Sequence, residues 1–249
     1  MSRTKIPDAM WNKIDEILWS FPVHYTSALR IFIEAVHWKL RTGAPWRDLP
    51  KMFGSYSTVF NRFNRWSKLG LWQRLFYELR NDIDDEWNFI DGTVVKAHQH
   101  ASGASTNNDE AIGKSVGGNT TKVHMLADSH GNPIDFVLTG GQVHDSKLAP
   151  VLIEISEAEN FMGDKAYHSQ EIRQLLADKG IQAIIPVKEN SLDKSNPGFD
   201  SHLYKQRHLI ENLFARLKHF RSIATRYDKI KINYASMLYL ACACIWSKF

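Results

Sequence analysis

Cysteine is scarce in this sequence, and long apolar runs are missing altogether. The 249 residues include two cysteines, Cys242 and Cys244, which lie two positions apart in one apolar segment. This spacing is too short to staple a fold and matches no zinc motif, so disulfide-rich and zinc-finger proteins are excluded and a reducing cytoplasm is expected. No apolar run has the length that spans a bilayer, and the first ten residues lack a signal-peptide core, so we expect neither a membrane protein nor a secreted one.

The charged residues are unevenly distributed along the chain. Residues 1–80 contain 13 Lys or Arg and 6 Asp or Glu, residues 81–204 contain 9 and 19, and residues 205–232 contain 8 and 2. The net charges of +7, −10 and +6 predict that both basic segments attract a polyanion, whereas the acidic middle repels one unless it binds cations. Blocks of like charge also occur as solvated surfaces, so the pattern alone does not decide between these explanations.

The first 80 residues have the apolar spacing of helices. A first helix is expected to open at Asp8, and a second to be capped by Ser27 and stopped by Gly43. A short turn at residues 46–49 lies between two prolines, and the last helix of this region covers residues 72–80.

The third helix of this region, from residues 54–57 to Gly70, has an apolar stripe and a separate basic face. The stripe consists of Val59, Phe63 and Trp66, and the basic face of Arg62, Arg65 and Lys68. A tight helix, turn and basic helix resembles a helix-turn-helix DNA reader, so we expect these three basic side chains to contact DNA. A helical packing domain with a solvated basic face has the same pattern and remains an alternative.

From residue 87 the apolar period changes from that of helices to that of strands. We expect strands at residues 87–97, 122–127, 134–139, 160–163 and 181–187. Helices are expected at residues 146–155, 170–178, 203–220 and 234–246, and polar loops at residues 98–120 and 191–202. This order indicates a mixed α/β layer fold, preceded by the helical region.

Three acidic residues occupy unusual positions in this pattern. Asp91 lies inside the first apolar strand, Asp164 follows another apolar strand, and Glu211 lies on the long helix. A carboxylate is costly to bury alone, and a cluster of carboxylates binds hard cations such as Mg²⁺ or Mn²⁺. Two such ions activate a nucleophile and stabilise the leaving oxygen of a phosphodiester. Acids at strand ends and turns that face water are the other explanation.

The helix around Glu211 has two different faces. Tyr204, Arg207, Glu211 and Lys218 fall on one stripe, about 60° wide at about 100° per residue. The apolar face is formed by other residues, namely Ile210, Leu213, Phe214, Leu217 and Phe220. The polar stripe suits phosphate contacts beside a metal ligand, although an ordinary amphipathic helix with an Arg207–Glu211 pair also fits.

Several segments together resemble a bacterial insertion-sequence transposase of the DDE type, in the insertion-sequence-five group. They are TGAPWRDLPKMFGSYSTVFNRFNRW, IDGTVVKAHQHASGA, GGNTTKVHMLAD, GGQVHDS, GDKAYHS and YKQRHLIENLFARLK. The last segment matches the family pattern Tyr-x2-Arg-x3-Glu-x6-Lys at every fixed position, after two acid motifs in the expected order. The resemblance covers nearly the whole chain, and Asn119, which stands where a bulkier apolar residue is expected, is one of few departures.

The resemblance implies a division into a helical DNA-binding domain, residues 1–84, and an RNase H-like catalytic domain, residues 85–249. It implies that Asp91, Asp164 and Glu211 bind two Mg²⁺ or Mn²⁺ ions, and that Tyr204, Arg207 and Lys218 position DNA. The substrate would be double-stranded DNA, both the terminal inverted repeats of the element and the target, held by a homodimer or larger assembly. Spacings of 73 and 47 residues between the acids leave no room for a large insertion domain.

Other functions remain open on the residues themselves. Five histidines lie in the same domain as the acids, namely His98, His100, His124, His144 and His168. His98-x-His100 with Asp145 or Asp164 would suit a zinc hydrolase, but no His-x3-His helix pair supports it. Asp145 is an alternative second carboxylate, although its place before a helix favours a capping role. A DNA-binding protein without catalysis has no need of the three acids, and a nuclease that cuts without joining needs the same three.

Overall fold

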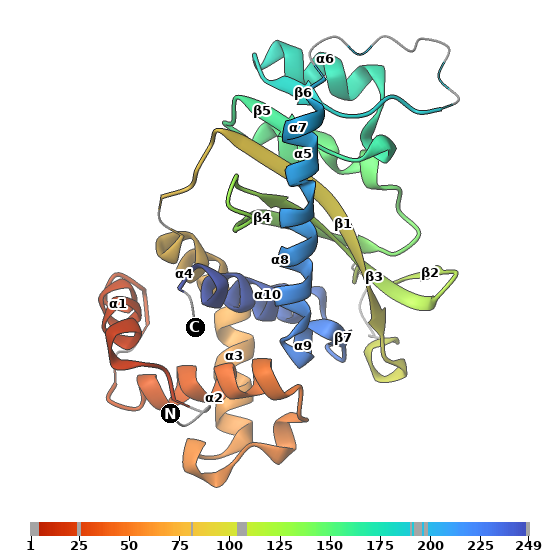
Figure 1. The fold of residues 1–249 in the computed structure, drawn as a ribbon. Coiled ribbons are helices and arrows are strands. Elements are labelled where there is room, and N and C mark those ends of the chain that lie inside the picture. The colour runs from red at the N-terminus through yellow and green to blue at the C-terminus, as the bar shows by residue number, and fades with distance from the viewer. Residues whose placement is uncertain are drawn as a thin grey trace. The chain divides into compact units, whose positions relative to one another are not determined.

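The protein is described by a computed structural model that covers residues 5–23, 26–80, 82–103, 109–189, 191, 196 and 199–247. The chain forms two compact units, which are described separately. Unit 1 consists of residues 1–81, 97–110 and 216–249, and unit 2 of residues 82–96 and 111–215. Figure 1 gives the labels of the elements. None of the helices in these described ranges is long and apolar enough to cross a membrane.

Unit 1 is helical. Its elements are α1 (Asp8–Trp19), α2 (Leu29–Thr42), η1 (Trp46–Asp48), η2 (Lys51–Phe53), α3 (Tyr56–Lys68), α4 (Leu71–Leu79), η3 (Gln99–Ala101), α9 (Arg221–Ala224), the short strand β7 (Thr225–Arg226) and α10 (Lys231–Trp246). The predicted N-terminal helices are therefore confirmed. The apolar helix α10 packs against α4, α3 and α2, which gives the N-terminal helices a shared core with the C-terminal end of the chain.

The structure confirms the predicted C-terminal end of α2 but not its predicted N-terminal cap. Gly43 ends the helix at φ 67°, a left-handed conformation that glycine adopts without strain, and its N–H donates to Lys39 O. The predicted cap at Ser27 is wrong. The helix starts one residue later than predicted, with Ala28 at the N-cap and no side-chain cap, and the N–H of Leu29 donates to Thr26 O in the turn before it.

The core of unit 1 contains a cluster of aromatic rings. Phe32 and Trp66 meet edge to face at a centroid distance of 5.0 Å, and Trp66 lies 5.2 Å from Trp72. Phe63 lies 5.6 Å from Trp72 and is fully buried. The apolar stripe predicted for α3 therefore faces this cluster, which holds α3 and α4 together.

Unit 2 contains a mixed sheet. Its strands are β1 (Trp87–Ala97, the last residue of which belongs to unit 1), β2 (Gly113–Ser115), β3 (Gly118–Ala127), β4 (Pro133–Gly140), β5 (Asn160–Met162) and β6 (Gln182–Ile184). They run in the order β2-β3-β1-β5-β6, and β4 also pairs with β3. The β1, β2, β3 and β4 pairings are antiparallel, whereas β5 pairs in parallel with β1 and with β6.

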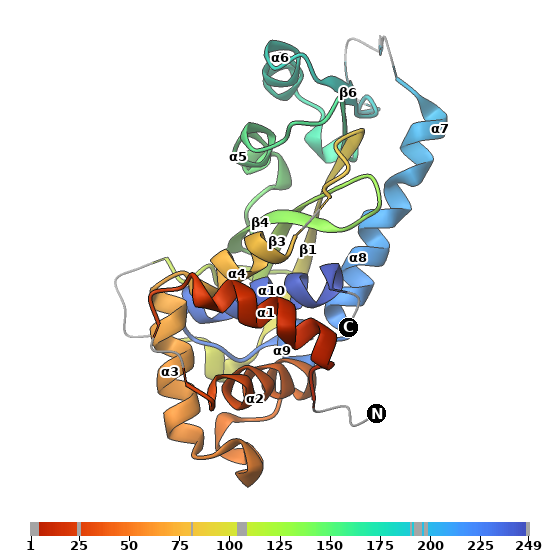
Figure 2. The ribbon, with the colours of Figure 1, turned by 90° about the vertical axis from the view of Figure 1, so that its left-hand side faces the viewer.

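Helices cover both faces of this sheet. They are α5 (Ala149–Glu154), α6 (Gln170–Asp178), α7 (Ser201–Tyr204), η6 (Lys205–Arg207) and α8 (His208–Lys218), with the short turns η4 (Asp145–Lys147) and η5 (Lys165–Tyr167). Figure 2 shows α5 and α6 on one side of the strands and α7 and α8 on the other. The first side encloses a core of buried residues from β1, β3, α5, β5, η5 and α6, including Ile90, Leu152, Phe161, Tyr167 and Leu176.

The predicted fold class is confirmed in its architecture, because an N-terminal helical region precedes a mixed α/β domain. Several details differ from the sequence prediction. Strand β2 and the start of β3 at Gly118 lie inside the predicted loop 98–120, of which residues 104–108 lie outside the described residues. Strand β6 ends at Ile184, two residues before Pro186, which lacks the N–H that a strand ladder requires. The predicted helix 203–220 is interrupted by the 3₁₀ turn η6.

The predicted boundary between a DNA-binding domain, residues 1–84, and a catalytic domain, residues 85–249, stays a prediction. The compact units divide the chain at other positions, and two of these divisions fall inside β1 and inside α8. Residues 97–110 and 216–249 thereby belong to the same compact unit as the N-terminal helices.

Candidate active site

The parallel pairing of β1 and β5 brings two of the predicted acids close together. Phe89 pairs with Met162, and Asp91 and Asp164 each lie two residues beyond this pair. Because parallel strands run in the same direction, Asp91, which lies inside β1, comes beside Asp164, which follows the end of β5. The carboxyl end of a parallel strand such as β5 is where open α/β sheets bind ligands.

Local backbone contacts fix both carboxylates. Asp91 Oδ1 accepts a hydrogen bond of 2.7 Å from the N–H of Gly92, and the side chain is 19% exposed. Asp164 is the N-cap of η5, and its Oδ1 accepts a bond of 2.8 Å from the N–H of Ala166. In each case one oxygen is used in a backbone contact, and the second oxygen of Asp91 contacts Arg207.

Glu211, the third acid, lies on α8, and Arg207, one turn before it, links it to Asp91. The guanidinium of Arg207 donates from Nη1 to Asp91 Oδ2 over 2.7 Å and from Nη2 to Glu211 Oε1 over 2.6 Å. Arg207 is 23% exposed and Glu211 56% exposed. The guanidinium therefore joins the strand carboxylate to the helix carboxylate, and the Arg207–Glu211 pair predicted for an ordinary helix is only half of the arrangement.

The electrostatics of these groups are coupled. Burial raises the pKa of Asp91, and the nearby charge of Asp164 raises it further, against the lowering effects of the Gly92 N–H and Arg207. Burial on its own would lower the pKa of Arg207, but the anionic charges around it, led by Asp91, outweigh this effect and raise it. The raised pKa of Asp91 thus reflects mainly its burial, whereas the raised pKa of Arg207 reflects the anionic groups around it.

Two tyrosines flank the acids. Tyr204 is half-buried, and burial raises its pKa, as do the charges of the three acids, while Arg207 opposes the shift. Tyr167 is completely buried, and burial followed by the charges of Asp145, Asp91 and Asp164 raises the pKa of its hydroxyl. No hydrogen-bond partner for the Tyr167 hydroxyl lies among the described residues. Tyr167 lies inside the second acid motif, GDKAYHS, but was not predicted to belong to the site.

A divalent cation suits this donor set. Carboxylate oxygens are the ligands that Mg²⁺ and Mn²⁺ prefer, and the mutual repulsion of Asp91 and Asp164 would be relieved by a cation. Within the described ranges, no three His, Cys, Asp or Glu side chains stand close enough together to hold a metal as they are. The guanidinium of Arg207 instead provides the positive charge between Asp91 and Glu211.

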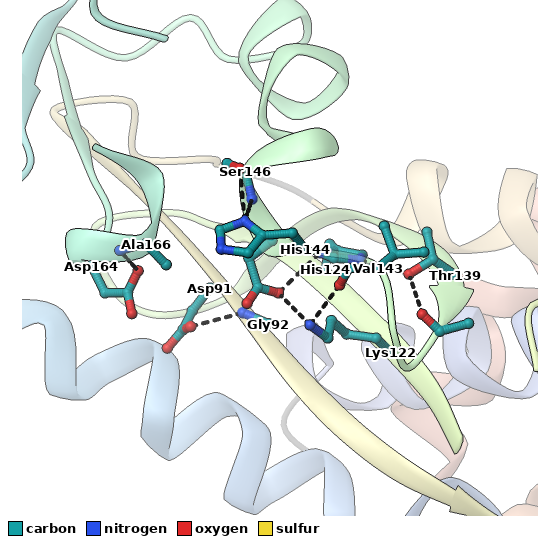
Figure 3. A network of polar contacts seen from close by, with 12 residues as sticks. Asp91, Gly92, Lys122, His124, Thr139, Val143, His144, Ser146, Asp164 and Ala166 are labelled. Carbon is teal, nitrogen blue, oxygen red and sulfur yellow. Dashed lines mark hydrogen bonds and ion pairs between the residues drawn. The ribbon is translucent and has the colours of Figure 1, made fainter. Parts of the chain in front are cut away.

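A second polar cluster lies beside Asp91 and was not predicted. Asp145 Oδ1 lies 3.2 Å from Lys122 Nζ and 3.5 Å from His124 Nδ1. Lys122 Nζ also donates to Val143 O over 2.7 Å. Figure 3 shows Gly92 between Asp91 and Lys122, so the two groups of charges share one backbone position. A lysine and a histidine two positions apart on a predicted strand were the available sequence signal.

The capping role predicted for Asp145 is wrong. The N-cap of η4 is His144, whose Nδ1 accepts from the N–H of Ser146, because the carboxylate of Asp145 is drawn toward Lys122 and His124. The other histidines of the zinc alternative are also engaged. His124 Nε2 contacts Thr139 Oγ1 at 2.8 Å, and in unit 1 the ring of His98 stacks on Tyr227 and its Nδ1 accepts from the N–H of His100.

The predicted DNA-contact residues have different environments. On α3, Arg65 and Lys68 are exposed, whereas Arg62 is half-buried with its guanidinium 4.6 Å from the ring centre of Phe32. Burial lowers the pKa of Arg62, and the charge of Arg65 lowers it further. Lys218 is exposed at the end of α8, in the part of the helix that belongs to unit 1.

Two family models match the chain. One, described as "Transposase DDE domain", matches residues 84–246, and the other, described as "Putative transposase of IS4/5 family", matches residues 6–76. The first range includes Asp91, Asp164 and Glu211, and the second includes Arg62, Arg65 and Lys68.

Three curated proteins are similar to parts of the chain. "Uncharacterized protein y4sN" of Sinorhizobium fredii is 44% identical over 75 residues, which are 30% of this chain and 60% of that protein. "Putative transposase for insertion sequence element IS6501" of Brucella ovis is 34% identical over 128 residues, 51% of this chain and 98% of the relative. The corresponding protein for element IS402 of Burkholderia cepacia is 28% identical over 137 residues, 50% and 62%. The chain thus spans less than two thirds of y4sN and of the IS402 protein.

Among solved structures, the Mos1 transposase paired-end complex with the left transposon end matches with a TM-score of 0.28 and 14% identity. The match covers 84% of this chain and 81% of that one. A pre-cleavage Mos1 transpososome matches with a TM-score of 0.29 and 11% identity, over 92% and 81%.

Proposed function

We propose, for a chain that belongs to the transposase DDE domain family, that it cuts the ends of an insertion sequence and joins the freed 3′-hydroxyl groups to target DNA. The observation that supports this most strongly is the meeting of three elements at one place. The parallel register of β1 and β5 aligns Asp91 with Asp164, and Arg207 connects Asp91 to Glu211 on α8.

The three carboxylates would hold Mg²⁺ or Mn²⁺, two ions in our proposal. Asp91 Oδ2 and the free oxygens of Asp164 and Glu211 are the ligands that remain after the backbone contacts are made. Bound divalent ions supply charge stabilisation for the attacking and leaving oxygens of a phosphodiester displacement. Arg207 would then release the carboxylates and turn to the negatively charged phosphate.

The reaction consists of two displacements at phosphorus. In the first, a water oxygen forms a bond to the phosphorus at the element end, the bond to the 3′ oxygen breaks, and this oxygen takes up a proton as the 3′-hydroxyl. In the second, that 3′-hydroxyl oxygen attacks a target phosphodiester and loses its proton, and a 3′ oxygen of the target strand leaves. Tyr204, Arg207 and Lys218 would orient the DNA backbone through hydrogen bonds and charge.

The basic face of α3 would bind the terminal inverted repeats. Arg65 and Lys68 are exposed and close in sequence to the partly buried Arg62, as a helix that lies along a DNA groove requires. Because an insertion sequence has two ends, we propose a homodimer or larger assembly on double-stranded DNA. The protein would act in the cytoplasm, at the nucleoid.

A cleavage and joining assay tests this function. Wild-type protein and Glu211→Gln would be incubated with DNA that carries the element ends, with Mg²⁺ or Mn²⁺, and Glu171→Gln on the exposed surface of α6 is the matched control. We expect the wild type and the control to cut and join, and Glu211→Gln to bind the ends without doing either. Equal activity of Glu211→Gln and the wild type would contradict the assignment of the third acid. Cutting without joining by the wild type would indicate a nuclease, and binding without cutting a regulator.

A further inference from the structure

Asp145 lies in the segment GGQVHDS, between the motifs of the first two acids, and its carboxylate faces inward. Its side chain is 28% exposed, and Oδ1 lies within 3.5 Å of two bases, Lys122 Nζ and His124 Nδ1. It is therefore neither a solvated surface acid nor the cap of η4, whose N-cap is His144.

Both bases that hold Asp145 are themselves fixed. They lie two positions apart on β3, so they project from the same face of the sheet. Lys122 Nζ donates to Val143 O over 2.7 Å, and His124, which is completely buried, contacts Thr139 Oγ1 through Nε2 at 2.8 Å. The two residues of β3 that Asp145 contacts are thus tied to β4 and to the segment before η4.

The carboxylate of Asp145 rests on the backbone of Gly92. A Cβ atom added to Gly92 would lie 2.4 Å from Asp145 Oδ1, a distance at which atoms overlap. Gly92 pairs with His124 across β1 and β3, so the glycine and the histidine lie side by side next to the Asp145 carboxylate. Any side chain at position 92 would displace Asp145.

Gly92 in turn orients the first acid, because its N–H donates to Asp91 Oδ1 over 2.7 Å. Asp91 and Gly92 are neighbours on a strand, so their side-chain directions point to opposite faces of the sheet. Asp145, Lys122 and His124 therefore lie on the face of β1 that is opposite to the Asp91 side chain.

We propose that Asp145 is a positioning residue for Asp91: held by Lys122 and His124, it fixes the peptide at Gly92, whose N–H sets the orientation of the Asp91 carboxylate. This inference rests on the proposed function, because it gives Asp91 the role of a metal ligand. Groups that orient a ligand from behind typically change metal affinity about 10- to 100-fold when they are removed.

The alternative is that Asp145 itself binds the metal. A cation at Asp145 Oδ1 would have to displace the ammonium of Lys122 from 3.2 Å, and it would lie on the other face of β1 from Asp91 Oδ2. These contacts favour the positioning role, and the experiment below separates the two.

The test compares Mn²⁺ binding, measured by electron paramagnetic resonance on the full chain without DNA, for wild type, Asp145→Asn, Gly92→Ala, the double variant and Glu211→Gln. Glu154→Gln, an exposed acid on α5, is the matched control. Thermal unfolding of each variant shows that it is folded. We expect Asp145→Asn and Gly92→Ala each to weaken Mn²⁺ binding about 10-fold with the number of bound ions unchanged. Because both act through the Gly92 peptide, the double variant should be no weaker than the weaker single variant.

Three results would overturn the proposal. Wild-type Mn²⁺ affinity in Asp145→Asn removes any positioning role. Loss of a bound ion in Asp145→Asn, with full additivity in the double variant, makes Asp145 a ligand. Weakened binding in Asp145→Asn with no effect of Gly92→Ala shows that the carboxylate does not act through Gly92. The Glu211→Gln variant separates this inference from the proposed function. Wild-type Mn²⁺ affinity in Glu211→Gln contradicts the proposed site. Weakened Mn²⁺ binding in Glu211→Gln, together with wild-type affinity in Asp145→Asn, contradicts the inference alone.

Discussion

The guanidinium of Arg207 is bonded to the carboxylate of Asp91 over 2.7 Å, across 116 positions of the chain. This contact joins the strand that bears the first acid to the helix that bears the third, and the second bond of Arg207 reaches Glu211 on that helix. An arginine that neutralises two carboxylates keeps them together when no cation is bound. The same residue must release them for a metal to bind, so it couples the metal to the helix.

Arg207→Ala should destabilise the metal-free protein, because Asp91 and Glu211 lose the cation that pairs them. Both Arg207 and Asp91 are mostly buried, so we expect a loss of about 1–3 kcal/mol in the free energy of unfolding. Saturating Mn²⁺ should restore part of this loss, and thus raise the unfolding midpoint more in the variant than in the wild type. Denaturant unfolding with and without Mn²⁺ measures both effects.

Glu78→Ala is the control for this prediction, because it removes an exposed pair with Arg74 at 4.0 Å and should change the stability by less than about 0.5 kcal/mol. Equal stability of Arg207→Ala and wild type without metal would show that the guanidinium does not hold the two acids together.

The basic face of α3 can be separated into a structural and a binding part. Arg62→Ala should lower the unfolding midpoint, because the guanidinium packs over Phe32 and Trp66. Arg65→Ala with Lys68→Ala should leave the midpoint unchanged and weaken DNA binding, with a shallower dependence on salt, since both are exposed. Binding isotherms on element-end DNA at several salt concentrations check this, and an unchanged affinity and salt slope would rule out α3 as the basic DNA contact.

His124 makes part of the stability depend on pH. Burial, opposed by the charge of Asp145 and aided by that of Lys122, lowers the pKa of His124 from 6.5 to about 4. The folded state therefore binds this proton less readily than the unfolded state. The free energy of unfolding is therefore not reduced by His124 above about pH 6.5, and it decreases by about 3 kcal/mol at most as the pH falls toward 4.

His124→Gln keeps a group that reaches Thr139 and removes the titration. The free energy of unfolding of this variant should fall less than that of the wild type between pH 6.5 and 4. The comparison isolates His124, because the carboxylates of both proteins titrate alike. Parallel pH profiles for the two proteins would mean that His124 is not the group responsible.

Tyr167→Phe should be tolerated by the fold. The hydroxyl is buried beside the acids without a hydrogen-bond partner among the described residues, and an unsatisfied buried hydroxyl costs free energy. Its removal should leave the stability equal or raise it by up to about 1 kcal/mol. A clear loss of stability in chemical denaturation would show instead that the hydroxyl has a partner, such as a bound water.

Local patterns predicted most of the elements correctly, because their causes are local. The bounds of α6 and β1 follow from apolar spacing and from flanking residues such as Ser169, whose hydroxyl caps α6. The interruption of the long helix at η6 was not predictable in this way. Its residues 205–207 are good helix formers, and the Arg207 contact to Asp91 arises only in the folded protein.

The candidate site likewise has one part that local patterns predicted and one part that they did not. The three acids were recognisable because carboxylates inside or just after apolar strands are unusual, and because the family resemblance supplies their order. Lys122 and Asp145 were not recognised as partners, since 23 positions separate them and only the β3–β4 register and the turn before η4 bring them together. Side-chain partners that depend on long-range register cannot be read from spacing.

The measurement that tests the central claim most directly is Mn²⁺ binding to the wild type and to Asp91→Asn, Asp164→Asn and Glu211→Gln, with element-end DNA present and cleavage prevented by a non-cleavable phosphate analogue. Three carboxylates that share the metal predict that each amide variant binds Mn²⁺ at least about 10-fold more weakly than the wild type, while all four proteins bind the DNA equally. Wild-type Mn²⁺ affinity in any one of the three variants would contradict the three-carboxylate site.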